Sequence, residues 1–245
     1  MSYSRTRPAQ LWHLAQEVKT SLWVPTGHPL TSEINVFSTD TDVFVLLLRR
    51  YYELCTEVRF VTGTGQRRRV IKLRPIAQTL GRSRLAALPG VHAVSGADVT
   101  GSFANKGKLT WWKMFKDANE ATTDALSKLG TRGLPTADTM AAIKKLVCRL
   151  YVPNTPIKTV SELRWSLFRK KQAQSEKLPP TQAAIREAIM RANCQALIWS
   201  LDSVPSPDLP PPQEYGSGLQ ITAGQRTMSG QIIRWPDNLS GRLRW

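Results

Sequence analysis

The chain has 245 residues, 41% of them hydrophobic, and its 34 Lys and Arg outnumber its 18 Asp and Glu to give a formal net charge of +16. This length fits one domain with extensions or two small domains, and the composition allows a sizeable core. The longest apolar run, Val43 to Leu48, is far too short to cross a bilayer, and no secretory signal is recognised. The three cysteines lack the spacing of a zinc site or a disulfide framework. We therefore expect a nuclear or cytoplasmic protein that is neither membrane-bound nor secreted.

The positive charge predicts a polyanionic partner. Segments 49–84 and 144–191 each carry an excess of +8, and the rest of the chain is balanced. Clusters of this kind are typical of proteins that contact the phosphates of nucleic acids. The alternative is that both segments are solvated faces of an ordinary protein.

The first part of the chain predicts a small sheet. Ile34–Phe37 has the pattern of a short buried strand, the acidic turn Ser38–Asp42 follows it, and Val43–Tyr52 is apolar over a helical length. Two further strands, Val58–Thr62 and Arg69–Leu73, flank the glycine-containing turn Gly63–Gln66 and predict a β-hairpin. This order predicts an α/β fold with a small, incomplete and mainly parallel sheet.

The remainder predicts a mostly helical region. Apolar residues recur at helical spacing in several segments, which are 76–80, 85–94, 109–117, 136–150, 160–171 and 180–201. We accordingly expect three parts: a divergent N-terminal segment, 1–33; a domain, 34–201; and a Pro-rich, extended and disordered tail, 202–245.

Three aspartates are candidate metal ligands. Asp40 and Asp42 lie two residues apart in the turn after the first strand, where α/β folds place their sites, and Mg²⁺ and Mn²⁺ prefer oxygen ligands of this kind. Asp98 lies in a glycine-rich loop that continues to Lys108. Taken singly, each aspartate is better explained as the cap of a helix or turn than as a metal ligand. His92 lies within an apolar segment and is predicted to be a packed core residue.

Together these segments resemble the flap-endonuclease-like nucleases, which are related to PIN domains. That family carries an Asp-x-Asp turn after a central strand, and then a Gly-x-Asp motif that leads into a glycine-containing helical element gripping the DNA backbone. The corresponding residues here are Thr39–Asp42, Gly96–Asp98 and Phe103–Lys108. A closer resemblance, from about Asn35 to Gly216, is to a group of animal proteins associated with mobile elements, whose motifs "DTDVxVLL", "FVTGTG" and "HAxxGxDxTxxFxxKGK" recur in this chain in the same order.

The resemblance implies binding of nucleic acid, DNA rather than RNA, and a site for Mg²⁺ or Mn²⁺ held by Asp40, Asp42 and Asp98. The residues expected to contact nucleic acid are Gly101, Lys106, Gly107, Lys108 and Lys113 of the loop and following helix, with Arg67, Arg68 and Arg69 of the hairpin. In a complete site the reaction would be metal-dependent phosphodiester hydrolysis.

The acidic segment that relatives carry before the Asp-x-Asp turn is absent upstream of Ile34, and so is the cysteine-rich tail. We therefore expect a remnant or truncated form that is weak or inactive as an enzyme. The alternatives are a non-catalytic nucleic-acid-binding or interaction protein, and a mobile-element-derived product without a selected role.

Overall fold

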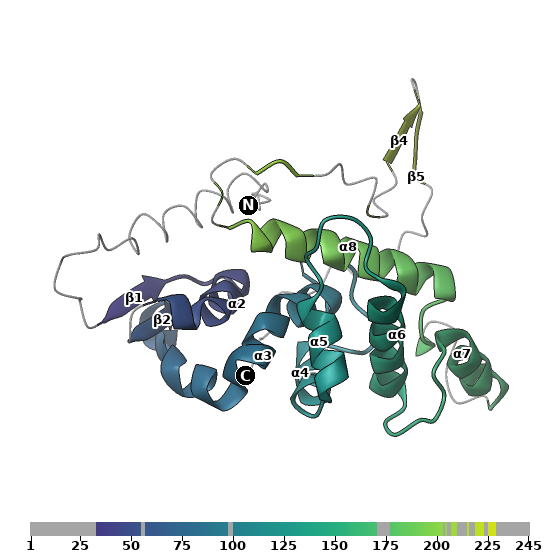
Figure 1. Ribbon diagram of the computed structural model, residues 1–245, viewed down its shortest axis with the longest axis horizontal. Coiled ribbons are helices and arrows are strands. Elements are labelled where there is room, and N and C mark those ends of the chain that lie inside the picture. The colour runs from purple at the N-terminus through teal and green to yellow at the C-terminus, as the bar shows by residue number, and fades with distance from the viewer. Residues whose placement is uncertain are drawn as a thin grey trace.

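The computed structural model describes residues 33–54, 57–97, 100–170, 177–202, 204, 207–209 and 215, together with the backbone of two strands at 219–222 and 225–228. A small sheet and its helix lie at one end of the molecule, and the remaining helices extend from it (Figure 1). None of the described helices is both long enough and apolar enough to span a membrane. Of the predicted N-terminal segment 1–33, all but the last residue lies outside the described residues.

The sheet contains three strands: β1 (Ile34–Phe37), β2 (Val58–Thr62) and β3 (Arg69–Lys72). β1 pairs with β2 in parallel, and β2 pairs with β3 in antiparallel fashion, in the order β1-β2-β3. The predicted α/β class with a small sheet and a hairpin is thus confirmed, with mixed pairing. The register places Val36, Phe60 and Ile71 side by side on the face that packs against the core.

Helix α2 (Thr41–Arg49) connects the two parallel strands. Its apolar positions Val45, Leu47 and Leu48 are buried. The ring of Phe44 lies 5.2 Å from that of Phe60, which packs the helix onto the sheet. A 3₁₀ turn, η1 (Tyr51–Glu53), follows. This strand, helix, strand order places the carboxyl ends of β1 and β2 at one edge of the sheet, which is where sites lie in α/β folds.

Helix α3 (Leu73–Val94) is broken at Gly81, whose φ of 71° and ψ of 167° are not helical. Glycine adopts this conformation readily because it has no Cβ. The two helices predicted for 76–80 and 85–94 are therefore the halves of one kinked element. Its second half is almost entirely buried and packs against α5 (Glu120–Ser127). A Cβ added at Gly90 would lie 2.2 Å from the carbonyl oxygen of Leu126, so this approach requires glycine.

The other helices are α4 (Lys108–Lys116), α6 (Ala137–Tyr151), α7 (Val160–Arg169) and α8 (Gln182–Ser200). Residues Asn119, Thr136, Thr159 and Thr181 cap α5 to α8 by accepting a backbone N–H from the first turn. In Figure 1, α8 lies along one side of the helical region, in contact with α3 and α6. Sequence patterns predicted α4, α6, α7 and α8 but missed α5.

The predicted tail contains one further element. Strands β4 (Leu219–Thr222) and β5 (Gln225–Met228) pair in antiparallel fashion. Periodicity alone indicated no element in this part of the chain.

Candidate functional site

The acidic turn lies between β1 and α2. The backbone N–H of Ser38 donates to the carbonyl oxygen of Val61 at 3.0 Å, which holds the start of the turn against the end of β2. Asp40 is the N-cap of α2, because its Oδ1 accepts the backbone N–H of Asp42 at 2.8 Å. Burial raises the pKa of the half-buried Asp40 carboxyl, and the hydrogen bond from Asp42 opposes part of that rise. Asp40 therefore caps α2, which is one of the two roles that the sequence allowed for it.

Asp42 is buried and points away from solvent. Its Oδ1 lies 2.7 Å from Nε2 of His92, whose side chain is only 8% exposed. The imidazole comes from the buried half of α3 and lies against the ring of Trp199, with centroids 5.4 Å apart. The packed core position predicted for His92 is present, and this histidine also holds one of the predicted metal ligands.

Lys108 completes this arrangement from the first position of α4. Its Nζ lies 3.0 Å from Nδ1 of His92, and it also donates to the His92 carbonyl oxygen at 3.1 Å and to Ser95 Oγ at 3.3 Å. A lysine ammonium can only donate, so Nδ1 accepts and the ring proton resides on Nε2, from which it is donated to Asp42. Asp42, His92 and Lys108 thus form a linear network in which one negative and one positive charge flank a neutral imidazole. We call it the Asp42–His92–Lys108 network.

The network defines what the predicted metal ligands can do. It brings the acidic turn and the end of the glycine-rich loop together. However, Oδ1 of Asp40 and Oδ1 of Asp42 are both engaged within the protein. Asp98 lies outside the described residues, and the residues that are described contain no group of three His, Cys, Asp or Glu side chains that could hold a metal ion. They do not by themselves fit a site for Mg²⁺ or Mn²⁺, and that site stays a prediction.

The loop residues predicted to contact nucleic acid lie in different environments. Gly107 is exposed and is the N-cap of α4. Lys113 is exposed on α4, whereas the Nζ of the half-buried Lys106 lies 5.0 Å from the ring centroid of Tyr151. The Lys108 amine points inward to His92, so the part of this residue expected to meet phosphate is held inside the fold. Gly101 is half-buried, with open space where a Cβ would lie.

The hairpin arginines lie at the same edge of the sheet as the acidic turn. Arg67, Arg68 and Arg69 are all exposed around the 3₁₀ turn η2 (Gly65–Arg67), which follows the carboxyl end of β2. The guanidinium of Arg68 lies over the ring of Phe37, 5.5 Å from its centroid. Since β1 and β2 are parallel, the acidic turn and the arginine turn leave the sheet in the same direction.

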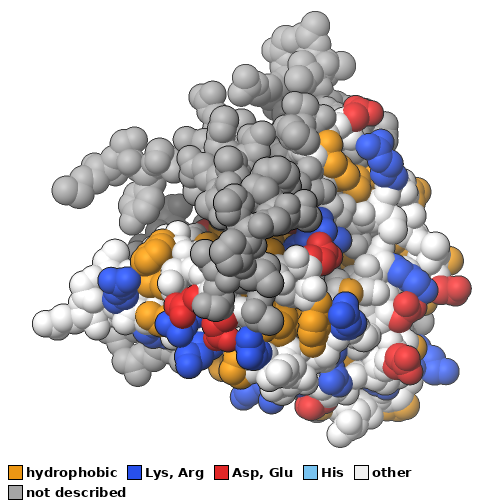
Figure 2. Space-filling view, turned by 60° about the vertical axis from the view of Figure 1, so that its left-hand side comes forward, with side chains coloured by type: hydrophobic (Ala, Val, Ile, Leu, Met, Phe, Trp, Pro, Cys, Tyr) orange, Lys and Arg blue, Asp and Glu red, His pale blue; other side chains and the backbone are white. Residues whose placement is uncertain are grey.

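Pairing removes much of the charge from the rest of the first basic segment. Arg50 bonds to Glu53 and Asp202, and Arg59 and Arg74 form ion pairs with glutamates, Glu33 and Glu57 respectively. On the face shown in Figure 2, Lys and Arg side chains are scattered with Asp and Glu among them. At the hairpin turn, by contrast, three exposed arginines lie together and none of them forms an ion pair within the described residues.

Sequence reasoning missed that His92 and Lys108 act together. They lie sixteen residues apart, on either side of an irregular loop, and no periodic pattern signals such a pair.

In comparisons with known proteins, no protein-family model, no curated protein and no solved structure matches this chain.

Proposed function

We propose that this chain is a remnant of a metal-dependent, flap-endonuclease-like nuclease that binds nucleic acid and cleaves it weakly or not at all. The observation that carries the proposal is the Asp42–His92–Lys108 network. A two-metal site needs several carboxylates free to neutralise two divalent ions. Here one oxygen of the Asp42 carboxylate accepts a hydrogen bond from His92, and the Lys108 amine contacts the other nitrogen of the imidazole.

Nucleic-acid binding is supported by the surface beside this network. The hairpin arginines are exposed at the same sheet edge, and Lys113 is exposed on the helix that begins at Lys108. Arginine and lysine contacts of this type neutralise phosphates and give salt-dependent affinity that is independent of base sequence. We propose DNA as the preferred nucleic acid, as the resemblance implies.

Cleavage and binding are tested separately. Purified protein is incubated with single-stranded, duplex and flap-containing DNA in Mg²⁺ or Mn²⁺, and products are resolved on a denaturing gel. We expect at most weak cleavage above that of an Asp40→Ala, Asp98→Ala double variant purified in the same way. Efficient, multiple-turnover, metal-dependent cleavage by the wild type that this variant lacks would refute the proposal of weak or absent activity.

Binding to the same DNA is measured by fluorescence anisotropy over a range of salt concentrations. Replacing Arg67, Arg68 and Arg69 by glutamine should weaken binding and lower the dependence of log Kd on log salt, by up to about 0.9 for each duplex phosphate that the protein no longer neutralises. Wild-type protein that binds none of these DNAs at low salt would refute the nucleic-acid part.

A further inference from the structure

A basic groove lies at the other end of the molecule from the acidic turn. It has a volume of about 640 Å³ and is formed by α5, α6 and the beginnings of α7 and α8. Four cationic side chains line it, and these are Lys144, Lys145, Arg149 and Lys158. Among the described residues that line it, none is Asp or Glu. We call it the α6 groove.

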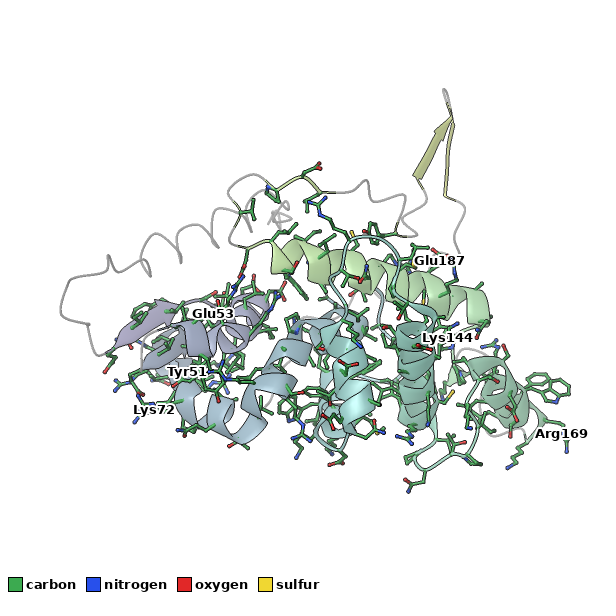
Figure 3. The ribbon with its side chains drawn as sticks, in the orientation of Figure 1. Tyr51, Glu53, Lys72, Lys144, Arg169 and Glu187 are labelled. Carbon is green, nitrogen blue, oxygen red and sulfur yellow. The ribbon has the colours of Figure 1, made fainter. Side chains whose placement is uncertain are left out.

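The cations of the α6 groove are available to a ligand. None of the four forms an ion pair or side-chain hydrogen bond within the described part of the chain. Lys145 and Lys158 are exposed, and Lys144 and Arg149 are half-buried. In Figure 3, Lys144 extends from α6 towards the side on which α7 lies. These four cations therefore line one concave surface, otherwise mainly apolar, without being neutralised by neighbours in the described part of the chain.

The backbone adds to this potential. Asn119 caps α5 and Thr159 caps α7, and both line the groove together with Gln182, the first residue of α8. The amino ends of helices carry partial positive charge and free N–H groups. Acidic residues in the first turns, Glu120 and Glu162, offset part of this charge from outside the groove.

The shape favours a single strand over a duplex. The lining residues of α6 run from Ala137 to Arg149, which corresponds to about 18 Å along the helix axis. A volume of this size lies in the range of roughly 300–1,000 Å³ that holds one small ligand. One strand can enter such a groove, whereas a duplex can only rest across it. The lining also contains small apolar side chains such as Ala121, Ala137 and Ala141, so the polar contacts come from the cations and from the uncharged polar residues at the helix starts.

An exposed aromatic pair lies on α7, the helix whose N-cap, Thr159, lines the groove. Trp165 and Phe168 of α7 are 61% and 58% exposed, and their rings stack with centroids 6.2 Å apart and an interplanar angle of 28°. Trp165 lies six residues beyond the Thr159 cap, or about 9 Å along the axis. Arg169, at the outer end of α7 in Figure 3, is also exposed. A cationic groove with exposed aromatic side chains nearby is the usual design of a surface for single-stranded nucleic acid.

We propose that the α6 groove binds the phosphate backbone of a single-stranded nucleic acid, and that Trp165 and Phe168 stack on bases of the same strand. This inference rests on the proposed nucleic-acid binding and adds a second surface, distant from the hairpin arginines. The contacts are to phosphate and to base faces, so binding is independent of sequence.

The test compares two variants of equal charge in the full chain. The groove variant carries Lys144→Gln, Lys145→Gln and Arg149→Gln. The control carries three exposed lysines outside the groove replaced by glutamine, at positions 116, 128 and 177. Binding of a fluorescent 20-nucleotide oligothymidylate is followed by anisotropy between 50 and 200 mM NaCl. We expect the groove variant to lose at least about tenfold in affinity and its salt dependence to fall by about 2, since each phosphate contact to a single strand contributes about 0.7. The control should stay within about threefold of the wild type.

A Trp165→Ala, Phe168→Ala variant provides an independent measurement. It should weaken binding by roughly tenfold and leave the salt dependence unchanged, because stacking involves no phosphate. Circular dichroism and thermal unfolding establish that each variant is folded, and the single charge reversal Lys145→Glu replaces the groove variant if that one is unfolded.

Equal affinities of groove variant and control would overturn the inference. If in that case the hairpin variant still loses binding, the proposed function stands and only the groove assignment fails. If the wild type does not bind the oligonucleotide, both fail. A competition experiment gives a further check. If polyglutamate of the same charge displaces the labelled strand as effectively as unlabelled oligothymidylate does, the groove is a general anion surface and the inference is overturned.

Discussion

Replacement of His92 by phenylalanine tests whether the Asp42–His92–Lys108 network holds the fold together. Phenylalanine keeps the ring volume next to Trp199 but removes the proton donor of the Asp42 carboxylate. Breaking a buried charged pair by deleting one partner costs about 3–5 kcal/mol, because the remaining charge is left without compensation. The Asp42 side chain is 11% exposed, so water replaces little of the lost donor. We expect a loss near 3 kcal/mol, at the lower end of this range, because the imidazole itself is neutral.

Thermal and urea unfolding at pH 7 measure this loss. For a chain of this size, 1 kcal/mol corresponds to roughly 2–4 °C, so the transition should fall by about 6–12 °C. His92→Gln is the matched control, since its amide can both donate to Asp42 and accept from Lys108, and it should lose less than half as much. The urea m-value should not change, because the surface exposed on unfolding is the same.

A double-mutant cycle separates the charge from the packing. In an Asp42→Asn background no carboxylate is stranded, so His92→Phe should cost at least about 1 kcal/mol less than in the wild type. If the substitution costs the same in both backgrounds, or lowers the transition by under about 3 °C, the network does not stabilise the fold through the Asp42 charge.

Three further changes test the surrounding structure. Asp40→Asn should match or exceed the wild type in stability at pH 7, since asparagine caps equally well and carries no charge to bury. Because burial raises the folded pKa of the Asp40 carboxyl, this advantage should vanish below about pH 4, where the wild-type group is protonated. An Asn variant that is less stable than the wild type at pH 7 would contradict this. Gly90→Ala should cost about 1–3 kcal/mol or more through overlap with the Leu126 carbonyl. Gly101→Ala, whose added Cβ would meet nothing within 4 Å, should leave the thermal transition in place, and equal shifts would refute the packing argument. The fully buried Asn193 side chain forms three hydrogen bonds to backbone groups of the loop before α6, and Asn193→Leu removes all three. The free energy of unfolding in urea should fall by about 3 kcal/mol. A decrease below about 1 kcal/mol would show that the loop finds other partners.

The sequence predicted the elements that have a strong local signal. Strands β1 and β2 occur at the predicted residues because their apolar runs are bounded by turn-forming residues. Helices α6 and α8 occur within two residues of prediction, because they combine a threonine cap with regular apolar spacing. Helix α5 was missed because it is only eight residues long, and several of those are threonine, serine or charged. Its stability comes from packing against α3 and α6, which local sequence does not reveal.

The candidate site was predictable only in part. The position of Asp40 and Asp42 after a strand follows from alternation of apolar residues and turns. The partners of Asp42 do not, because His92 comes from a helix fifty residues away and Lys108 from another. Charge counting marked segments 49–84 and 144–191 alike, but it could not show that Arg50, Arg59 and Arg74 of the first form ion pairs whereas four cations of the second line one groove.

The energetics of α6 distinguish a binding surface from a merely solvated one. Lys145 and Arg149 lie one helical turn apart, and like charges at this spacing destabilise a helix by about 0.2–0.5 kcal/mol. Some cations elsewhere in the described part of the chain are neutralised, as Arg50 is by Glu53 and Asp202. A protein that only had to fold would gain from an acidic residue at either position of α6. The unpaired charge is therefore better explained by a polyanion that neutralises it on binding. Because the groove shares no residue with the acidic turn, such binding requires neither Asp40 nor Asp42, and it is compatible with a nuclease-like scaffold that does not cleave its ligand.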